Sequence, residues 1–266
     1  LGNDFVVFDC THDPLDLSAE QATKIADRNF GVGCDQLLFV EPPRSADTEF
    51  YYRIMNSDGG EVEHCGNGAR CFAQFVHEQG LSNSNPVRVG TACGVIELQR
   101  NADGTVTVNM GPPFLEPATI PFVAEAQAAE YTLQSSTGQY PVGAVSMGNP
   151  HAVVKVDNID SAPVESLGKE LEHHHRFPNR VNVGFLEVTN RQHGRLRVWE
   201  RGAGETLACG TGACAAMVSG VLRGWFDERV QLSLRGGNLI LEWAGEGHPV
   251  MMTGPATTVF NGQLPL

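Results

Sequence analysis

Two cysteines of this sequence stand in motifs of the same kind. Cys65 opens the motif Cys-Gly-Asn-Gly-Ala, and Cys209 opens the motif Cys-Gly-Thr-Gly-Ala. Each motif leads into an apolar run with helical spacing, from Ala69 to Gln79 and from Ala213 to Arg223. The pattern predicts two helices, each with a cysteine and two glycines just before its N-terminus.

A helix N-terminus presents unpaired backbone N–H groups and the positive end of the helix dipole. It therefore binds carboxylates and favours a thiolate over a thiol. The glycines leave room for backbone amides to approach a ligand. The amides in question are those of Gly66, Asn67, Gly210 and Thr211. Two such helices would hold one carboxylate between two cysteines.

This arrangement suits the inversion of a carbon stereocentre. A base removes a proton from one face of the carbon, and an acid delivers a proton to the other face. We expect one cysteine to act as thiolate and the other as thiol, with the roles exchanged in the reverse direction. The helix dipoles and amides would stabilise the negative charge that develops beside the carboxylate.

Other readings of the cysteine motifs fit the sequence less well. Gly210 to Ala215 has the spacing of a dinucleotide fingerprint, but no apolar strand runs directly into Gly210. Zinc sites use closer cysteine pairs than Cys65 with Cys71 or Cys209 with Cys214. Facing thiols can oxidise to a disulfide, which we interpret as a hazard because the sequence holds no Cys-x-x-Cys. We therefore expect neither a cofactor nor a metal.

The run of three histidines at positions 173 to 175 is a second candidate for metal binding. It closes a predicted helix and directly precedes Arg176 and the Phe177-Pro178 pair. The position favours a solvated helix end over a ligand cluster.

The two motifs belong to a longer internal repeat. Glycine-rich turns recur in any chain with 30 glycines, but they do not recur as an ordered series at a constant offset. The matching landmarks, 143 to 146 residues apart, are Gly2-Asn3 with Gly148-Asn149, Gly60-Glu61 with Gly204-Glu205, Cys65 with Cys209, and Gly111-Pro112 with Gly254-Pro255. The helices also end alike, at Gly80 and Gly224. The series indicates a duplicated fold.

The elements that position the cysteines follow the same order in both halves. A helix is expected over Ala19 to Asp27, where Ser18 and Gln21 form a capping box, and another over Ser161 to Glu172. The turn Asn101-Ala-Asp-Gly104 predicts a hairpin. Strands are expected at Phe5–Asp9, Leu37–Val40, Tyr51–Met55, Val87–Val89, Val95–Leu98, Thr105–Met110, Val142–Ser146, Val153–Val156, Val183–Val188, Arg195–Glu200, Gln231–Leu234 and Leu239–Trp243.

These elements predict an α+β fold of two pseudo-symmetric, duplicated domains. Each domain is expected to wrap a mostly antiparallel or mixed sheet around one central helix, with the active site in the cleft between the domains. Four prolines between positions 112 and 121 mark the crossing. We predict an N-terminal domain over residues 1–111 and a C-terminal domain over residues 112–254, with the tail 255–266 packing back on the first domain.

Composition limits the class of partner. The chain has 266 residues, of which 41% are hydrophobic and 18% charged, enough for two cores. Its formal charge of −13 disfavours nucleic acid and anionic membranes, so a small molecule is the expected partner. The longest charge-free run, Tyr131 to Val154, is too polar for a membrane span.

The cysteines and the first residues bear on the compartment. Seven cysteines make an odd set without the paired spacing of a secreted framework, which favours the cytoplasm. No signal peptide is visible, and the chain opens at Leu1 without methionine close to a predicted strand. We therefore expect a few further residues before Leu1.

Seven motifs spread over nearly the whole chain resemble those of diaminopimelate epimerases. The two cysteine motifs, at this separation, make the resemblance specific. The motifs are Gly2-Asn-Asp-Phe5, Gly33-Cys-Asp-Gln36, Asn56-Ser-Asp-Gly59, Cys65-Gly-Asn-Gly-Ala-Arg70, Gly148-Asn-Pro-His151, Phe177-Pro-Asn-Arg-Val-Asn-Val183 and Glu200 to Gly212.

The resemblance implies a cofactor-independent enzyme that interconverts LL- and meso-diaminopimelate for lysine and peptidoglycan synthesis. It implies that Cys65 and Cys209 are the acid/base pair, that the amides of residues 66, 67, 210 and 211 hold the carboxylate, and that Asn3 and Gln36 line the reacting centre. It assigns the far end of the substrate to Asn56, Asn149, Asn182, Glu200 and Arg201, and it assigns tuning of the cysteines to His151 and Glu200.

The same residues also have other interpretations. The asparagines also suit turns and caps. A related racemase of the proline racemase type would use the same two cysteines, and a phenazine-pathway isomerase shares the fold but not both cysteines. An amino-acid-binding protein without chemistry would need neither thiol. The resemblance also implies a homodimer, although relatives often carry tyrosine where this chain has Phe260.

Overall fold

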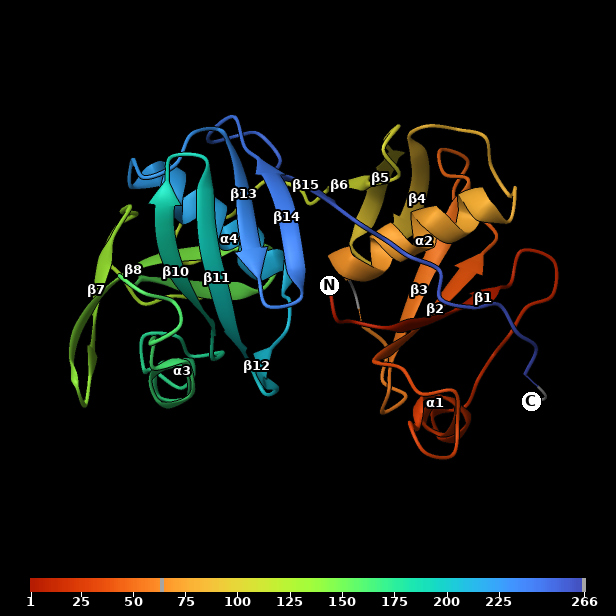
Figure 1. Cartoon of the computed structure of the whole chain (residues 1–266), viewed down its shortest axis with the longest axis horizontal. Helices are drawn as coiled ribbons and strands as arrows, with labels where there is room; N and C mark the ends of the chain where they lie inside the picture. The colour runs from red at the N-terminus through yellow and green to blue at the C-terminus, as the bar shows by residue number, and fades with distance from the viewer. Residues whose placement is uncertain (63–64, 265–266) are drawn as a thin grey trace. The chain divides into compact units, whose positions relative to one another are not determined.

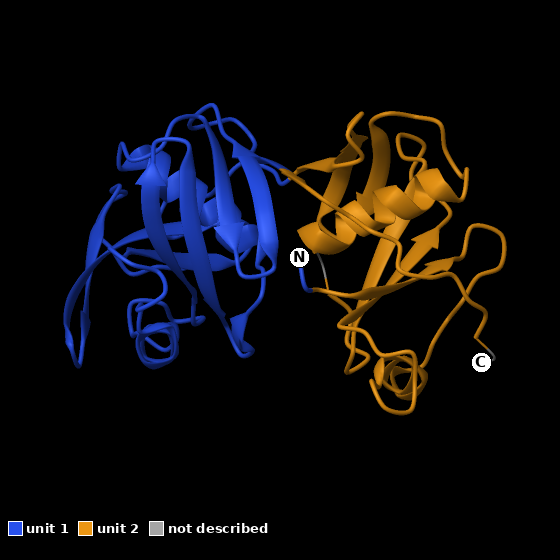
Figure 2. Cartoon of the chain, in the orientation of Figure 1, with its two compact units in different colours: residues 1–2, 110–252 blue, residues 3–109, 253–266 orange. Residues whose placement is uncertain are grey.

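The structure of this protein is a computed structural model that describes residues 1–62 and 65–264. The chain forms two compact units (Figure 2). Unit 1 comprises Leu1–Gly2 and Met110–Met252, and unit 2 comprises Asn3–Asn109 and Thr253–Leu266. Each unit has its own buried core.

Unit 2 wraps a sheet around the helix α2 (Figure 1). The strand order is β1-β2-β3-β4-β5-β6, in which β1 with β2 and β3 with β4 are parallel and the other neighbours antiparallel. Helix α2 packs against β1, β2, β5 and β6. The elements are β1 (Phe5–Asp9), α1 (Ala19–Ala26), β2 (Gln36–Glu41), β3 (Phe50–Asn56), α2 (Gly66–Glu78), β4 (Val87–Thr91), β5 (Gly94–Arg100) and β6 (Val106–Asn109).

Unit 1 wraps a longer sheet around α4. Its order is β14-β13-β11-β10-β9-β8-β7, with β12 paired to β11; β9 with β10 and β11 with β13 are parallel. The elements are β7 (Tyr131–Ser135), β8 (Gly138–Ser146), β9 (Pro150–Lys155), α3 (Val164–Glu172), β10 (Asn182–Asn190), β11 (His193–Glu200), β12 (Gly204–Thr206), α4 (Gly210–Leu222), β13 (Arg229–Leu234), β14 (Gly237–Glu242) and β15 (Met251–Gly254), the last of which leads into unit 2.

The two units repeat one pattern of strand pairing. In unit 2 a parallel pair, an antiparallel pair, a parallel pair and an antiparallel pair follow one another from β1 to β5. The same sequence of pairings runs through β9, β10, β11, β13 and β14 in unit 1. In both units a helix of 13 residues lies in the connection between the two strands of the third pair, β3 with β4 and β11 with β13. The duplicated α+β fold expected from the sequence is confirmed.

Both central helices begin three residues earlier than the apolar periodicity predicts. Helix α2 begins at Gly66 and α4 at Gly210, so the two glycines of each motif lie inside the first helical turn. Glycine weakens a helix interior, which is why the pattern placed the starts later. The predicted ends are confirmed, since Gly80 and Gly224 adopt left-handed φ values of 65° and 72°.

Several other bounds differ from those expected. Strands β7, β12 and β15 were not predicted, and helix α3 begins at Val164 after the N-cap Pro163, not at Ser161. The histidine run after α3 is only partly solvated. His173 and His175 are exposed, but His174 is buried and its ring stacks on that of His175, with centroids 4.3 Å apart.

The helices reflect two kinds of packing. Helix α1 has the predicted capping box, in which Ser18 and Gln21 exchange side-chain and backbone hydrogen bonds, and only one face is buried. Helix α4 is buried on nearly all sides because strands surround it, and its sequence is accordingly apolar throughout. A rigid, buried α4 fixes the position of Cys209 at its start.

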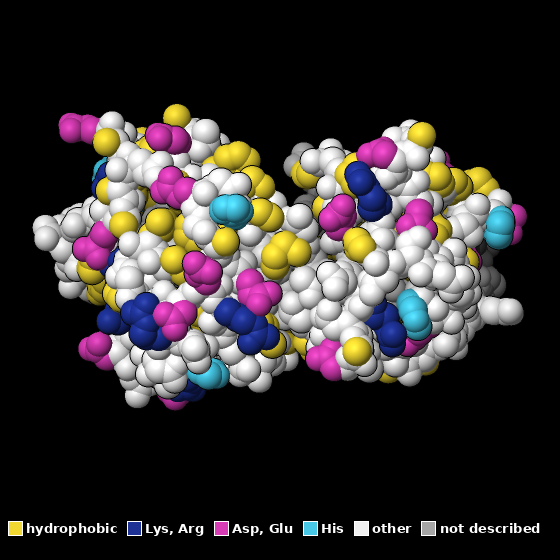
Figure 3. Space-filling view, turned by 90° about the horizontal axis from the view of Figure 1, so that it is seen from above, with side chains coloured by type: hydrophobic (Ala, Val, Ile, Leu, Met, Phe, Trp, Pro, Cys, Tyr) yellow, Lys and Arg dark blue, Asp and Glu magenta, His cyan; other side chains and the backbone are white. Residues whose placement is uncertain are grey.

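The surface carries mixed charge. On the face drawn in Figure 3, basic side chains lie singly or in small groups beside acidic ones in each unit. That face offers no broad basic surface of the kind that nucleic acid requires. Within residues 1–62 and 65–264, no helix is both long enough and apolar enough to cross a bilayer.

Candidate active site

Cys65 is the N-cap residue of α2. Its backbone is extended, with φ −143° and ψ 106°, and its sulfur accepts a hydrogen bond from the Gly68 N–H at 3.4 Å. The first turn of a helix has N–H groups without intrahelical partners, and a side-chain acceptor at the N-cap meets one of them. The thiol thus occupies the place that serine or aspartate usually holds at a helix start.

The second glycine of the motif leaves room for this geometry. A Cβ atom at position 68 would lie 2.3 Å from the Tyr52 hydroxyl oxygen and 3.5 Å from the Cys65 sulfur. Tyr52 is buried, and its hydroxyl donates to the Cys65 carbonyl at 3.4 Å. Since the tyrosine ring is packed in the core, a side chain at position 68 would displace it from the helix start.

A chain of side-chain hydrogen bonds joins the first turn of α2 to the segment before β1. The buried Asn67 accepts from Arg70 Nη2 at 2.8 Å and donates to Asn3 Oδ1 at 2.5 Å. Asn3 in turn donates to Asp35 Oδ2 at 3.0 Å. The structure therefore brings together two residues that the resemblance assigned to the reacting centre, Asn3 and Asn67.

Gln36 and Asn56 also meet. They are the first residue of β2 and the last residue of β3, which pair directly in the antiparallel register. Gln36 Nε2 donates to Asn56 Oδ1 at 2.9 Å, and both side chains are half-buried. The resemblance assigned these two amides to opposite ends of the substrate, whereas the register places them side by side.

Cys209 holds the corresponding place at the start of α4, but its side chain makes no capping hydrogen bond. It is an N-cap residue with φ −129° and ψ 111°, and it is 5% exposed. The Thr211 hydroxyl lies 3.6 Å from its sulfur. A Cβ atom at position 212 would approach the sulfur to 3.2 Å and Val198 to 3.1 Å. Gly212 therefore corresponds to Gly68 in position and in packing.

Glu200 supplies a negative charge near Cys209. It ends β11, is half-buried, and its Oε1 accepts from the Thr206 hydroxyl at 2.6 Å. Burial, followed by the charge of Glu200, raises the pKa of Cys209 well above its ordinary value. The Thr211 hydroxyl and the Gly212 N–H act in the opposite direction.

As expected, amides at the helix N-termini lower the pKa of both cysteines, but burial outweighs them. Burial raises the pKa of Cys65 to about 11, although the Gly68 N–H and the Arg70 charge lower it. The desolvation of a thiolate costs more free energy than the stabilisation that the helix dipole and the amides give it. Both cysteines are therefore thiols at neutral pH.

Asn182 joins two segments of unit 1. It is 3% exposed; its Oδ1 accepts from the Arg201 N–H at 2.9 Å, and its Nδ2 donates to the Pro150 carbonyl at 3.0 Å. The Arg201 side chain is exposed and donates to the Asn179 carbonyl at 2.9 Å. The structure therefore brings together Asn182 and Arg201, two residues assigned to the far end of the substrate.

His151 lies in β9, directly after Pro150. It is 1% exposed, and its Nε2 pairs with Asn149 Oδ1 at 3.0 Å. Because the amide oxygen accepts, Nε2 carries the proton and Nδ1 does not. Burial, with a smaller contribution from the Arg201 charge, lowers the pKa of His151 to about 3. The imidazole is therefore neutral near pH 7.

The predicted residues divide between the units as their motifs do. Asn3, Gln36, Asn56, Gly66 and Asn67 lie with Cys65 in unit 2. Unit 1 holds Cys209 with Asn149, His151, Asn182, Glu200, Arg201, Gly210 and Thr211.

Known proteins resemble this chain in sequence and in fold. The sequence model of the family described as "Diaminopimelate epimerase" matches residues 1–115 and 143–259. A protein named diaminopimelate epimerase from Ectopseudomonas mendocina is 59% identical over 100% of this chain and 96% of its own length. Its namesake from Thioalkalivibrio sulfidiphilus is 58% identical over 99% of this chain and 96% of its own length.

This chain belongs to the diaminopimelate epimerase family. Membership places it among epimerases, isomerases that invert a stereocentre. More distant solved structures share the fold alone. A probable proline racemase from Agrobacterium radiobacter, solved with bound carbonate, has a TM-score of 0.66 and 17% identity, over 96% of this chain and 83% of its own. A PhzF-family protein from Bacillus anthracis has a TM-score of 0.64 and 17% identity, over 96% and 90% of the two chains.

Several contacts of this epimerase-family site were not predicted. The Tyr52 hydroxyl donates to the Cys65 carbonyl, and Arg70 donates to Asn67. The Thr206 hydroxyl donates to Glu200, and Glu172 accepts from the Gly202 N–H in the turn after Glu200. Arg70 stands inside a motif and could have been singled out from its position. Thr206 also stands inside a motif, whereas Tyr52 and Glu172 lie 13 and 30 residues from their partners and carry no local signal. Among the described residues, no group of three or more His, Cys, Asp or Glu side chains could hold a metal ion.

Proposed function

We propose that this protein interconverts LL- and meso-2,6-diaminopimelate without a cofactor, in the synthesis of lysine and of peptidoglycan precursors. One observation carries the proposal. Cys65 and Cys209 are N-cap residues of equivalent 13-residue helices, in a chain 59% identical to a protein named diaminopimelate epimerase. The equivalence supports a pair of like groups that act on opposite faces of one carbon.

The proposed reaction moves protons and leaves oxidation states unchanged. The sulfur of one cysteine, as thiolate, takes the α-proton; the C–H bond breaks and its electron pair remains on the α-carbon. The S–H bond of the other cysteine then breaks, and its proton bonds to the opposite face of that carbon. The first-turn amides of residues 66, 67, 210 and 211 bind the adjacent carboxylate and stabilise the charge. Exchange with solvent restores the starting protonation.

The raised pKa values suit this role. An α-proton beside a carboxylate is weakly acidic, so a strong base is required to remove it. Burial raises the pKa of Cys65 and of Cys209, which makes each thiolate a stronger base once it has formed. Within this proposal two residues of unit 1 tune the pKa values of the cysteine pair. Glu200 acts through its negative charge, and His151 acts as a neutral ring that adds no charge.

Recognition of the far end of the substrate needs acceptors for an ammonium and donors for a carboxylate. Glu200 supplies an acceptor, and the exposed Arg201 guanidinium supplies paired donors. Asn182 contributes chiefly by holding the Arg201 backbone, because both ends of its amide are engaged with the backbone. Asn56 and Asn149 complete the proposed set, and Asn3 and Gln36 line the reacting centre.

Solvent deuterium incorporation tests the function. The reduced protein, incubated with LL-diaminopimelate in deuterated water without added cofactor, is expected to produce the meso isomer with deuterium at the α-carbon. L-proline in a parallel reaction tests the proline racemase alternative. Binding of diaminopimelate without exchange would support a binding protein instead and would overturn the enzymatic proposal.

We also propose a cytoplasmic homodimer. Near the tail, Val259 and Phe260 are 88% and 69% exposed, and two such apolar side chains favour a protein contact. Phe260 cannot supply the hydroxyl that relatives often carry there. Sedimentation equilibrium is expected to give twice the 28.7 kDa mass of the chain, and a monomer at micromolar concentration would contradict the proposal.

A further inference from the structure

A buried carboxylate ends helix α3. Glu172 is the last residue of the helix and is 4% exposed. A negative charge at this end opposes the helix dipole, and burial adds a cost of desolvation. Helix stability therefore does not explain a glutamate here, and its partners must offset both costs.

Several groups of unit 1 surround the carboxylate, the most distant being the His173 ring at 4.0 Å from Oε1. Its Oε2 accepts from the Trp199 indole N–H at 2.8 Å, and its Oε1 accepts from the Gly202 N–H at 2.9 Å. The Arg180 guanidinium lies 3.6 Å from Oε1. Burial pushes the pKa of Glu172 upward, but the bonds from Trp199 and Gly202 together with His173 and Arg180 outweigh it, and the pKa lies below its ordinary value. Glu172 is therefore ionised at neutral pH.

One of these partners belongs to the turn that follows Glu200. Gly202 has a left-handed φ of 77°, and the Ala203 N–H donates to the Glu200 carbonyl at 3.1 Å. The turn carries Arg201 and connects β11 to β12. The Gly202 bond attaches this turn to the end of α3.

A second segment is attached at the same place. The Val181 N–H donates to the Glu172 carbonyl at 3.1 Å, directly before Asn182. Asn182 Oδ1 accepts from the Arg201 N–H, and Arg201 Nη1 donates to the Asn179 carbonyl. Residues 179–182 and residues 199–202 are thus joined to each other and to Glu172.

We propose that Glu172 is a positioning residue for recognition of the far end of the substrate. It holds the segments that carry Asn182, Glu200 and Arg201 in one arrangement, and it contacts the substrate with no atom of its own. The inference rests on the proposed function, because the far end is read by these residues only if diaminopimelate is the substrate.

The variant Glu172→Gln tests the inference by changing one atom. An amide has one acceptor oxygen, whereas both carboxylate oxygens now accept an N–H, so the new NH₂ group must face the Trp199 or the Gly202 donor. A buried hydrogen bond to a charged group is stronger than one between neutral groups, so its loss leaves room for a tenfold effect on binding. We expect KM for LL-diaminopimelate to rise about tenfold, while kcat stays within about twofold.

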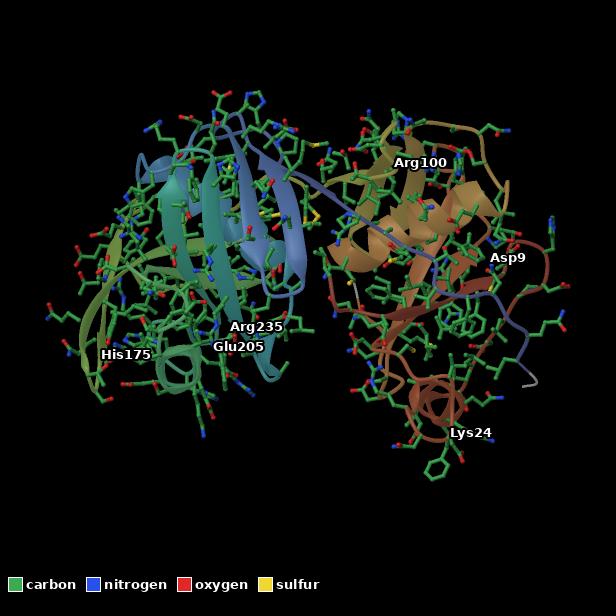
Figure 4. All side chains as sticks on the ribbon, viewed as in Figure 1. Asp9, Lys24, Arg100, His175, Glu205 and Arg235 are labelled. Carbon is green, nitrogen blue, oxygen red and sulfur yellow. The ribbon has the colours of Figure 1, made fainter. Side chains whose placement is uncertain are left out.

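Glu205→Gln is the matched control. Glu205 lies in β12 of the same unit, its side chain is 17% exposed, and it pairs with Arg197 at 2.7 Å and with Arg235 at 3.2 Å. Figure 4 labels Glu205 and Arg235 near one another. The control removes one half-buried carboxylate charge that has no bond to the turn at Gly202. We expect its KM to stay within about twofold of the wild-type value.

Amide hydrogen exchange gives a readout that does not require activity. Exchange over residues 199–204 is expected to be faster in Glu172→Gln than in Glu205→Gln. Equal exchange in the two variants, or equal KM values, would overturn the positioning role. A fall in kcat at unchanged KM would also overturn it, since the effect would then lie in the chemical step.

Two further points keep the test decisive. If Glu172→Gln does not fold, Glu172→Asp is compared with Glu205→Asp in the same assays, because the shorter side chain withdraws the carboxylate from the turn but keeps its charge. If the wild-type protein neither binds nor epimerises diaminopimelate, the proposed function fails, and the exchange comparison alone decides whether Glu172 holds the turn.

Discussion

Each cysteine side chain performs one half of the proposed reaction, so neither can replace the other. Cys65→Ala or Cys209→Ala removes proton transfer at one face, and net epimerisation is expected to fall at least about a hundredfold. Binding of diaminopimelate should survive, because amides and the far-end residues provide it. Product formation and calorimetric binding are the measurements.

Cys10→Ser is the control for these substitutions. Cys10 is 1% exposed in the core of unit 2 that includes Leu37 and Phe39, so its replacement should affect stability and not turnover. Near-normal epimerisation by Cys209→Ala would show that Cys209 is not a required acid or base.

His151 links the site to acid stability. Its pKa of about 3 lies below the ordinary value of 6.5, so below about pH 6.5 the unfolded chain takes up a proton that the folded protein does not. Stability is therefore present above pH 6.5 and is lost as pH falls toward 3. Between pH 7 and pH 5 the loss is about 2 kcal/mol.

His151→Gln removes this dependence, since the glutamine amide can occupy the place of Nε2 beside Asn149 without titrating. Urea unfolding at pH 7 and pH 5 measures the difference between variant and wild type. An identical loss of stability in both proteins would show that His151 is not buried as a neutral ring.

The start of α2 depends on the contact between Gly68 and Tyr52. In Gly68→Ala the new methyl group must displace a packed tyrosine, and we expect a destabilisation of about 1–3 kcal/mol. Tyr52→Phe removes the hydroxyl and a weak hydrogen bond, at less than about 1 kcal/mol. The double variant should lose less free energy of unfolding than the two single variants lose together, because the phenylalanine ring leaves space for the new methyl group. Additive denaturation midpoints would refute this account of the helix start.

At the scale of the whole molecule, the proposed reaction requires both sulfurs to reach one carbon. If each lies about 3 to 3.5 Å from that carbon on opposite faces, the sulfurs of Cys65 and Cys209 are roughly 6 to 7 Å apart in the substrate-bound state. A crystal structure with a non-reacting substrate analogue, prepared under reducing conditions, measures this distance. Sulfurs much farther apart in an otherwise competent complex would exclude the two-base mechanism.

The sequence alone determined the features that depend on neighbours along the chain. The left-handed Gly80 and Gly224 and the capping box at Ser18 all involve groups within a few residues of one another. The duplication was also visible, since an ordered series of landmarks at a nearly constant offset survives in the sequence. Such signals identified the fold class and the family.

Tertiary structure decided the features that depend on distant segments. The contacts of Asn3 with Asn67, of Gln36 with Asn56 and of Glu172 with Trp199 join residues 20 to 64 positions apart, through strand registers and packing that no local pattern encodes. The early starts of α2 and α4 also belong here, because packing against Tyr52 and Val198 requires the glycines within the first turn. The protonation of both thiols was decided by burial, since the desolvation of a sulfur depends on everything packed around it and not on the motif that carries it.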